Sequence, residues 1–304
     1  MIKTTIVGLG KIGYFYDANN RNKRLTHYSS VIKDKNFTIV SVVEKKNKFY
    51  NSFKKKSKIP IYKNIISAIE NHSTELLIIA CNLDIRIINQ IIKKTNIKYI
   101  LAEKPFLISK KEFDKLRINL KKNKIFFSLN FQRNFSSMYT KYFMNLKKGI
   151  LGNNLNFFCY YNRDFYSNAT HLLNLLILSS KKLLSVKRIN SKCIYLKFSN
   201  LDAYFFNVSK EYNNNSFLIF GSKGKFEITS RPEVGKLYLK AKDKDYKEIN
   251  KLKLKKKIKF LQKYPQKSVL NNIYKTLKKN TEPDLSLNHV AIYLQYMDKI
   301  RKIV

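Results

Sequence analysis

The sequence predicts an α/β protein with two domains: a doubly wound parallel sheet first, then an α+β domain with a large, mostly antiparallel sheet. Two observations lead to this prediction. Apolar runs alternate regularly with segments of helical spacing as far as residue 122, whereas strand-like runs follow one another closely from residue 155 onward. The chain has 304 residues, 44% of them hydrophobic, so it is long enough to bury two cores. We set the domain boundaries at 1–122 and 123–304.

Strands and helices alternate in the first domain. Its apolar runs are nearly continuous and helical segments separate them, which is typical of a parallel sheet covered on both faces. The expected strands are TTIVG at 4–8, FTIVSVV at 37–43, ELLIIAC at 75–81 and IKYILAE at 97–103. The expected helices lie at 64–72, 85–95 and 110–122.

The second domain begins with the strand IFFSLN at 125–130, and the pattern changes after about Arg133. Short runs of alternating and aromatic residues, separated by turn residues, then predict an antiparallel sheet. Its expected strands are LNFFCYYN at 155–162, SKCIYLKF at 191–198, DAYFFNVS at 202–209, SFLIFG at 216–221, GKFEITS at 224–230 and GKLYLKAK at 235–242. Helices are expected at 171–180, 264–280 and 285–303.

The net charge of +41, from 61 Lys and Arg against 20 Asp and Glu, raises the possibility of a polyanionic partner such as nucleic acid or acidic lipid. The excess is mostly lysine and accompanies abundant Asn, Ile, Tyr and Phe, all of which have A/T-rich codons. The lysines are also spread along the chain, and the densest run, 251–259, is short. We therefore favour codon bias over a specific nucleic-acid surface.

Three cysteines, Cys81, Cys159 and Cys193, form no C-x-x-C pair and are far apart in the sequence. This spacing argues against both a disulfide framework and a zinc site, so no metal is expected and a reducing cytosol fits best. No stretch approaches about 18 apolar residues, and the N-terminus lacks an apolar signal core. We expect a cytoplasmic protein with no membrane span.

The segment GLGKIG at 8–13 directly follows the first expected strand. Gly8, Gly10 and Gly13 fit the G-x-G-x-x-G pattern, in which the backbone approaches a pyrophosphate at the start of a helix. The intervening Leu9, Lys11 and Ile12 would line the cofactor together with the glycines. A structural βαβ unit without a ligand is the alternative.

The second expected strand ends at Glu44, where a carboxylate can accept hydrogen bonds from the adenosine ribose. Because 31 residues separate Gly13 from Glu44, we expect an insertion in this crossover, at 16–24. A carboxylate repels a ribose 2′-phosphate, so Glu44 favours NAD over NADP. Lys45 and Lys46 weaken this preference, since either could reach such a phosphate.

The fourth apolar run ends in Ala102-Glu103-Lys104-Pro105, and here the sequence resembles the glucose-fructose oxidoreductase / inositol dehydrogenase (Gfo/Idh/MocA) family. Further stretches match the family's pattern in order: GLGKIG, THYSS at 26–30, SLNFQRNF at 128–135, KKGILGN at 147–153, NATHLLNLL at 168–176 and FLIFGSKGKFEI at 217–228. The resemblance covers nearly the whole chain. It implies a Rossmann domain joined to an antiparallel-sheet domain.

The resemblance also implies catalytic roles for Lys104 and His171. The Lys104 ammonium would hydrogen-bond the reacting hydroxyl and stabilise the developing alkoxide. His171 would take the hydroxyl proton, a task that suits imidazole because its unperturbed pKa of about 6.5 is close to working pH. Without the family context, Lys104 would be read as a surface lysine and His171 as a histidine packed at a helix start.

Several positions depart from the family's pattern. The family has Asp four residues before the histidine and three residues after it, whereas this chain has Ser167 and Asn174. Asn168 stands nearby, and the stretch from Asn168 to His171 resembles that of a branch of the family found among surface-polysaccharide sugar enzymes. Asn168 could hold the substrate or the histidine. The loop after the third strand also differs, with Asn82 and Arg86 where the family often has Pro and His.

The remaining expected site residues surround the cofactor and the substrate. Ala80, Cys81, Asn82 and Glu103 are expected to line the cofactor. Asn130, Arg133 and Arg163, with Lys104, Asn168 and His171, are expected to contact the substrate. A guanidinium binds phosphate or carboxylate with paired hydrogen bonds, which suits a nucleotide-linked or acidic sugar.

These observations predict an NAD-dependent oxidoreductase that acts on a secondary alcohol or ketone of a sugar or sugar nucleotide, in surface-polysaccharide biosynthesis. The resemblance further implies a homodimer or homotetramer formed through the exposed face of the second sheet. Two alternatives stay open: a non-catalytic dinucleotide sensor or scaffold, and a basic binder of nucleic acid or an anionic surface. The sugar, the carbon oxidised and the direction of reaction are not given by the sequence.

Overall fold

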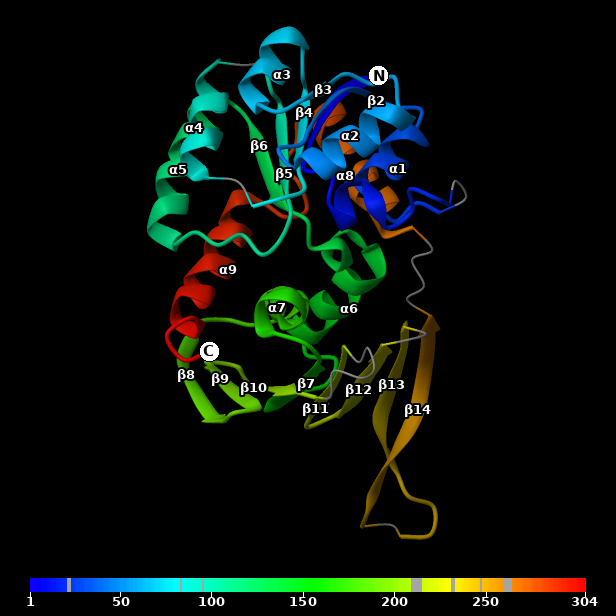
Figure 1. Ribbon diagram of the computed structural model, residues 1–304. Coiled ribbons are helices and arrows are strands. Elements are labelled where there is room, and N and C mark those ends of the chain that lie inside the picture. Colours follow the sequence, from blue (N-terminus) through cyan, green and yellow to red (C-terminus); the bar gives the residue numbers. More distant parts are fainter. Residues whose placement is uncertain are drawn as a thin grey trace. The chain divides into compact units, whose positions relative to one another are not determined.

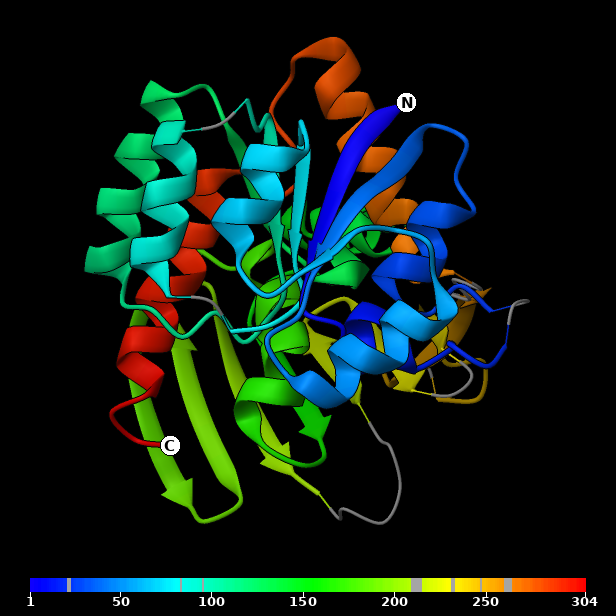
Figure 2. The same cartoon turned by 45° about the horizontal axis from the view of Figure 1, so that its top comes forward.

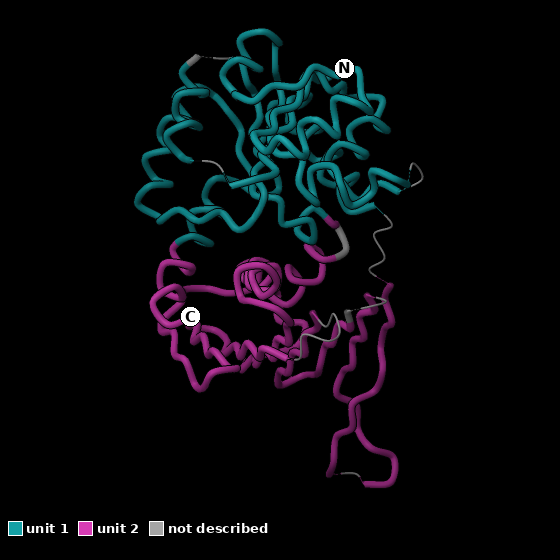
Figure 3. Tube along the Cα trace, in the orientation of Figure 1, with its two compact units in different colours: residues 1–135, 264–294 teal, residues 136–263, 295–304 magenta. Residues whose placement is uncertain are grey.

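The structure is a computed structural model that describes residues 1–20, 23–82, 84–94, 96–208, 215–230, 233–246, 248–259 and 264–304. The chain forms two compact units (Figure 3). Unit 1 contains Met1–Phe135 and Tyr264–Leu294, and unit 2 contains Ser136–Lys263 and Gln295–Val304. This division differs from the expected 1–122 and 123–304, because the chain returns to unit 1 near its end.

Unit 1 contains a parallel sheet of six strands in the order β3-β2-β1-β4-β5-β6 (Figure 1). The strands are β1 (Ile2–Val7), β2 (Phe37–Val43), β3 (Ile61–Tyr62), β4 (Leu76–Ile79), β5 (Tyr99–Ala102) and β6 (Phe126–Leu129). The strand order reverses beside β1, and all pairings are parallel, so the predicted doubly wound sheet is confirmed. β6, which we assigned to the second domain, belongs to this sheet.

Helices flank this sheet (Figure 2). They are α1 (His27–Ile32), α2 (Asn47–Lys56), α3 (Ile65–Asn71), α4 (Ile85–Lys94), α5 (Lys110–Lys122) and α8 (Pro265–Lys279), with α9 (Leu287–Ile300) beginning in unit 1 and ending in unit 2. α5 shows why such segments form where they do. Ser109 caps its first turn in a capping box with Glu112, and the apolar stripe of Phe113, Leu116 and Leu120 is buried.

Unit 2 contains an eight-stranded sheet in the order β14-β13-β12-β11-β7-β10-β9-β8. Its strands are β7 (Leu155–Tyr161), β8 (Leu183–Asn190), β9 (Cys193–Phe198), β10 (Leu201–Asn207), β11 (Ser216–Gly221), β12 (Gly224–Ser230), β13 (Glu233–Lys242) and β14 (Asn250–Lys259). Only β7 and β10 pair in parallel, so the mostly antiparallel sheet is confirmed. We did not predict β8 and β14, which are the two edge strands and carry mostly exposed residues.

One face of this sheet is covered and the other is not. Along β7, Leu155, Phe157, Cys159 and Tyr161 are buried, and the residues between them are partly exposed. α6 (Ser137–Lys147) and α7 (Thr170–Ile177) lie over the covered face (Figure 1). Among the described residues, no helix combines the length and apolar character that spanning a membrane requires.

Candidate functional site

The three glycines after β1 differ in what a side chain at each position would meet. A Cβ at Gly8, whose φ is +93°, would lie 2.8 Å from the Cys81 Cβ. A Cβ at Gly13 would lie 2.0 Å from the Gly8 carbonyl oxygen, so only glycine lets the segment pack against the strand end. A Cβ at Gly10 would meet no atom within 4 Å. Gly10 therefore borders open space, as the residue that approaches a pyrophosphate should.

The helix that we expected directly after these glycines is very short. A single five-residue π-helix spans Lys11–Phe15, and the next helix, α1, begins only at His27. Two residues of the expected insertion, at positions 21 and 22, lie outside the described residues. The first amides of a helix still lack intrahelical acceptors, so this turn can donate to an anion, but with a shorter dipole than the sequence suggested.

Glu44 lies beside the glycine turn, as predicted. Its side chain is only 7% exposed, and its carboxylate accepts hydrogen bonds from two backbone amides: Leu9 N at 2.7 Å and Lys46 N at 2.8 Å. The first bond ties the end of β2 to the glycine turn. The carboxylate is thereby fixed beside the glycine turn, and its contact with a ribose stays a prediction.

A pocket of about 450 Å³ opens at this edge of the sheet. Its lining includes Gly8, Gly10, Glu44, Ala80, Cys81 and Asn82, all expected to contact the cofactor, together with Lys45, Lys46 and Lys63. A second pocket of about 340 Å³ shares Cys81 and Asn82 and also contacts Glu103 and Pro105. The first pocket lies at the carboxyl ends of β1, β2 and β4, and the second lies at those of β4 and β5, where open α/β sheets bind their ligands.

Cys81 lies where the two pockets meet. Cys81 is exposed to solvent, although protein atoms around it partly desolvate the thiol. Burial and, secondarily, the negative charge of Glu44 raise the pKa of this thiol to about 11. Cys81 is therefore a neutral lining group at working pH and does not act as a nucleophile.

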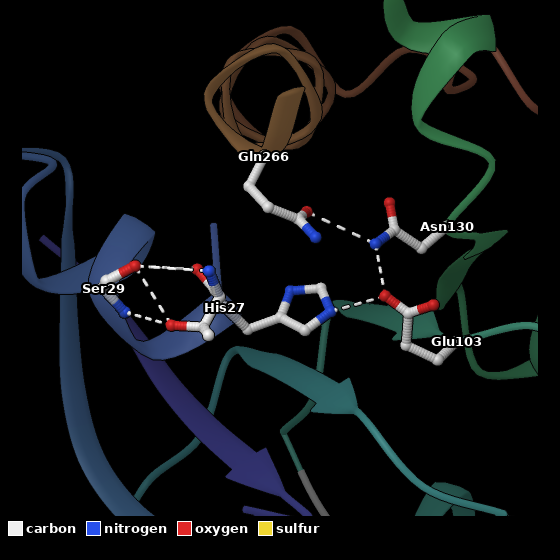
Figure 4. Close-up of polar contacts among 6 residues, drawn as sticks. His27, Ser29, Glu103, Asn130 and Gln266 are labelled. Carbon is white, nitrogen blue, oxygen red and sulfur yellow. Dashed lines mark hydrogen bonds and ion pairs between the residues drawn. The ribbon is translucent and has the colours of Figure 1, made fainter. Parts of the chain in front are cut away.

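Glu103 is held by a buried polar network rather than pointing freely into the pocket (Figure 4). Its Oε1 atom lies 2.8 Å from His27 Nε2 and accepts a hydrogen bond from Asn130 Nδ2 at 2.5 Å. Asn130 Nδ2 also donates to Gln266 Oε1, at 3.3 Å. The first turn of α1, the end of β5, the end of β6 and the start of α8 thus converge on the residue that precedes Lys104.

The position of His27 follows from the loop before it. The Asp17 carboxylate accepts hydrogen bonds from Leu25 N at 2.6 Å, Thr26 Oγ1 at 2.7 Å and Ser29 Oγ at 2.5 Å. Thr26 caps α1 in a capping box with Ser29. Because the loop is closed on Asp17, His27 is fixed at the first position of α1 and reaches Glu103.

The expected substrate residues of unit 1 follow neighbouring strands. Lys104 is the second residue after the end of β5, is half-buried and forms a cis peptide bond with Pro105. Asn130 follows β6, where its backbone amide donates to Ala102 O at 2.8 Å, and Arg133 lies in the 3₁₀ turn Gln132–Phe135. The Asn130 side chain is 1% exposed, so in this structure it contacts Glu103 and not the pocket.

The expected residues of unit 2 lie on one continuous segment. The π-helix Phe165–Ala169 leads directly into α7, and His171 is the second residue of α7 and half-buried. Asn168 Nδ2 donates to both the backbone and the side-chain oxygen of Asn162, at 2.8 Å each. Arg163 is exposed and has a φ of +66°. Lys104 and His171 belong to different units, so their pairing stays a prediction.

Ser167 stands where the family has Asp, and it contacts the carboxylate of Asp164. Its Oγ donates to Asp164 Oδ2 at 2.6 Å and its amide to Asp164 Oδ1 at 2.7 Å. Burial would raise the pKa of the Asp164 carboxyl, but these hydrogen bonds outweigh burial and hold the pKa below its ordinary value. Asp164 thus caps this helix as a charged group.

Two residues of the site were missed by the sequence analysis. His27 lies in the THYSS stretch that contributed to the resemblance, and its place directly after a capping threonine could have indicated a fixed side chain. Gln266 carries no such signal, because it lies 163 residues from Glu103 in the sequence. Within the described ranges, no group of three or more His, Cys, Asp or Glu side chains could hold a metal ion.

No protein-family model matches the sequence, and no curated protein matches it. Solved structures match nearly the whole chain. A dehydrogenase from Chromobacterium violaceum has a TM-score of 0.73 at 12% identity and covers 99% of this chain and 94% of its own. A 3-ketoreductase from Actinomadura kijaniata in complex with TDP-benzene and NADP has a TM-score of 0.74 at 10% identity, with 99% and 96% covered.

A super-repressor mutant of Gal80p from Saccharomyces cerevisiae matches equally well, with a TM-score of 0.74, 13% identity and 99% and 95% of the two chains covered. At these identities the likeness establishes the fold. The same fold therefore occurs in two enzymes and in a repressor. The chain has the two-domain fold of these proteins, and the resemblance to the glucose-fructose oxidoreductase / inositol dehydrogenase family is confirmed in that fold.

Proposed function

We propose that this protein is an NAD-dependent oxidoreductase that transfers a hydride between nicotinamide and a secondary alcohol or ketone of a sugar or sugar nucleotide. The observation that carries the proposal is the pocket at the carboxyl edge of the parallel sheet, bounded by the glycine turn and Glu44. The 3-ketoreductase of the same fold was solved with NADP and TDP-benzene, which supports a nicotinamide dinucleotide and a nucleotide-linked substrate. A cytosolic role in surface-polysaccharide biosynthesis belongs to the same proposal.

We assign NAD rather than NADP because Glu44 is a fixed, buried carboxylate at the end of β2. A 2′-phosphate bound there would meet this negative charge at short range, in a site shielded from water. Lys45, Lys46 and Lys63 also line the pocket, but all three side chains are exposed, where charge interactions are worth less. The buried charge therefore decides the preference.

The proposed reaction uses two catalytic side chains. The nicotinamide, when bound, supplies the hydride acceptor for oxidation. Lys104 donates a hydrogen bond to the reacting oxygen and stabilises negative charge on it, and His171 takes the hydroxyl proton as the carbon–hydrogen bond breaks. For reduction the same groups act in reverse, with His171 returning the proton.

The test is turnover on a panel of free and nucleotide-linked sugars with NAD or NADP, followed by NADH or NADPH absorbance. We expect turnover with NAD, a loss of about 10²-fold or more in kcat for Lys104→Ala and His171→Ala, and little change in NADH affinity. Arg86→Ala is the matched control, since Arg86 pairs only locally with Asp84 at the surface. A His171→Ala protein as fast as wild type would refute the assigned proton carrier.

A non-catalytic dinucleotide sensor is the second candidate, favoured by one observation. Ser167 replaces the family's Asp and is engaged with Asp164, and a repressor shares the fold. This candidate predicts saturable NADH binding with no turnover on any member of the panel. Turnover on a single sugar at a physiological rate would exclude it.

We also propose that a second copy of the chain covers the open face of the unit 2 sheet. Aromatic rings gather there from alternate positions: Phe158 stacks on Tyr204 at 5.4 Å, and Tyr160 stacks on Phe206 at 5.5 Å. All four side chains are partly exposed in the single chain. A contiguous aromatic face of this kind is typical of a subunit interface. Light scattering should give a dimer or tetramer, and Tyr204→Glu should dissociate it; a monomeric wild type would refute the proposal.

A further inference from the structure

The Glu103 carboxylate is held by side chains that are more buried than Glu103 itself. The Glu103 side chain is 11% exposed, whereas His27 is 2% exposed and Asn130 and Gln266 are each 1% exposed. Three of the elements that hold it, α1, β6 and α8, are distant in the sequence. Such an arrangement fixes one side chain from several directions, which surface polar groups do not do.

The chemistry of the carboxylate dictates how the two amides are oriented. An ionised Glu103 only accepts hydrogen bonds, so Asn130 must present its Nδ2 to it. Since Asn130 Nδ2 also faces Gln266, Gln266 must present its Oε1. This leaves Asn130 Oδ1 and Gln266 Nε2 buried without a hydrogen-bond partner among the described residues.

These two unpaired atoms argue against a purely stabilising role for Gln266. Leaving a buried polar atom without a partner costs more stability than one neutral hydrogen bond of 3.3 Å returns. An apolar residue of the same shape would therefore stabilise the fold as well or better. The polar side chain of Gln266 must therefore be explained by its effect on the position of the residues around it.

The residues around Gln266 connect it to Glu103, the residue that precedes Lys104. Asn130 is attached to β5 through its backbone bond to Ala102 O, one residue before Glu103. Gln266 is the second residue of α8, after Pro265 at the helix start. Asn130 lies shortly before the chain leaves unit 1 and Gln266 shortly after it returns, so their bond joins the two segments that border the crossings.

We propose that His27, Asn130 and Gln266 are positioning residues: together they hold Glu103, and through it they set the direction in which Lys104 is presented to the reacting oxygen. This rests on the proposed function, in which Lys104 acts on that oxygen. Gln266 is the positioning residue for which the sequence carries no signal. Its contribution is geometric, so it affects the rate of the chemical step rather than the binding of cofactor.

The test is Gln266→Met, which keeps the length of the side chain and removes both polar atoms. We expect kcat to fall about tenfold or more, since small misplacements of a catalytic group are costly, with the substrate KM and the NADH Kd within about threefold of wild type. The melting temperature should stay unchanged or rise. The matched control is Thr276→Val, a buried polar-to-apolar change on the same helix, about 15 Å away by helix rise, which should leave kcat unchanged.

An unchanged kcat of the Gln266→Met protein, with or without a loss of stability, would overturn the proposal. His27→Gln provides a second variant and should show the same split between kcat and KM. If wild type turns over no sugar, the proposed function fails by itself. The positioning is then read from the rate at which acetic anhydride labels Lys104 relative to the exposed Lys111, which should differ at least about threefold between wild type and Gln266→Met; equal labelling would refute it.

Discussion

At the scale of single residues, the structure separates groups that line the cofactor pocket from groups that support it. Gly10, Glu44 and Cys81 border the pocket at the carboxyl edge of the parallel sheet, and their contact with a cofactor stays a prediction. Asn130, which the resemblance implied as a substrate contact, bonds to Glu103, which also lines the second pocket. A motif indicates that a residue matters, but its direct contacts depend on neighbours that come from elsewhere in the chain.

Cys81 gives a residue-scale prediction that depends on pH. Because burial and Glu44 raise its thiol pKa to about 11, the reactive thiolate is scarce at neutral pH. Its alkylation by iodoacetamide should therefore be roughly a hundredfold slower at pH 7.5 than that of an ordinary thiol, and should rise about tenfold per pH unit up to pH 10. Peptide mass spectrometry measures this rate.

NAD should slow the labelling of Cys81, because this residue lies on the pocket wall. Cys81→Ser is the control, since Cys159 and Cys193 are buried and should take up little label. A Cys81 rate already maximal at pH 8 would contradict the raised pKa of this thiol.

At the scale of elements, the crossover between β1 and β2 departs most from expectation. The sequence predicts an insertion but not its consequence, which is that the usual long helix becomes a π-turn, a loop and a helix of six residues. The loop keeps its form because one carboxylate, that of Asp17, replaces the hydrogen bonds that a longer helix would supply. Such long-range side-chain closure leaves no periodic signal in the sequence.

Asp17→Asn tests this account of the loop. One of its carboxylate oxygens becomes a donor that faces other donors, so we expect a loss of about 2 kcal/mol or more in the free energy of unfolding, measured by urea titration. Asp34→Asn is a suitable control, because Asp34 accepts only from Asn36 in its own turn. Equal stability of the two variants would show that the loop is held by other contacts.

α9 gives a second element-scale prediction. Burial lowers the pKa of His289 to about 4, below the value of about 6.5 in the unfolded chain, so protonation opposes folding. The stability from the neutral form is fully present above pH 6.5 and is lost as the pH falls toward 4, by about 2 kcal/mol between pH 6.5 and 5. Unfolding curves recorded at several pH values should show this loss in wild type, and His289→Gln should lack it. If the free energy of unfolding falls with pH in the same way in both proteins, the loss does not come from His289.

At the scale of the whole molecule, the sequence predicted the two sheets well and the boundary between the units less well. Interior strands such as β4 and β5 are buried over their full length and read clearly as apolar runs. The edge strands β8 and β14 were missed because most of their residues are exposed and many are charged or polar, so they lack the apolar runs that mark the interior strands. The return of α8 to unit 1 is set by tertiary packing, which no local pattern reports.

The net charge leads to a prediction for the whole chain. β14 carries lysine at most of its positions, yet these side chains are exposed at a sheet edge, where they also prevent pairing with other strands. We expect retention on a heparin column that is lost by about 0.2 M salt, as for counterion release without a specific site. Saturable binding of one nucleic-acid sequence that persists above this salt concentration would favour the basic-binder alternative.

The central claim is that a dinucleotide lies against the glycine turn of unit 1, and Gly10→Val tests it most directly by calorimetric titration with NADH. A valine fits the folded protein, since Gly10 has a φ of −63° and open space around its Cβ position, but it would occupy the room a pyrophosphate needs. We predict that Gly10→Val keeps the melting temperature of wild type and binds NADH at least about tenfold more weakly. Equal affinity of the two proteins for NADH, or no binding by wild type, would contradict the account.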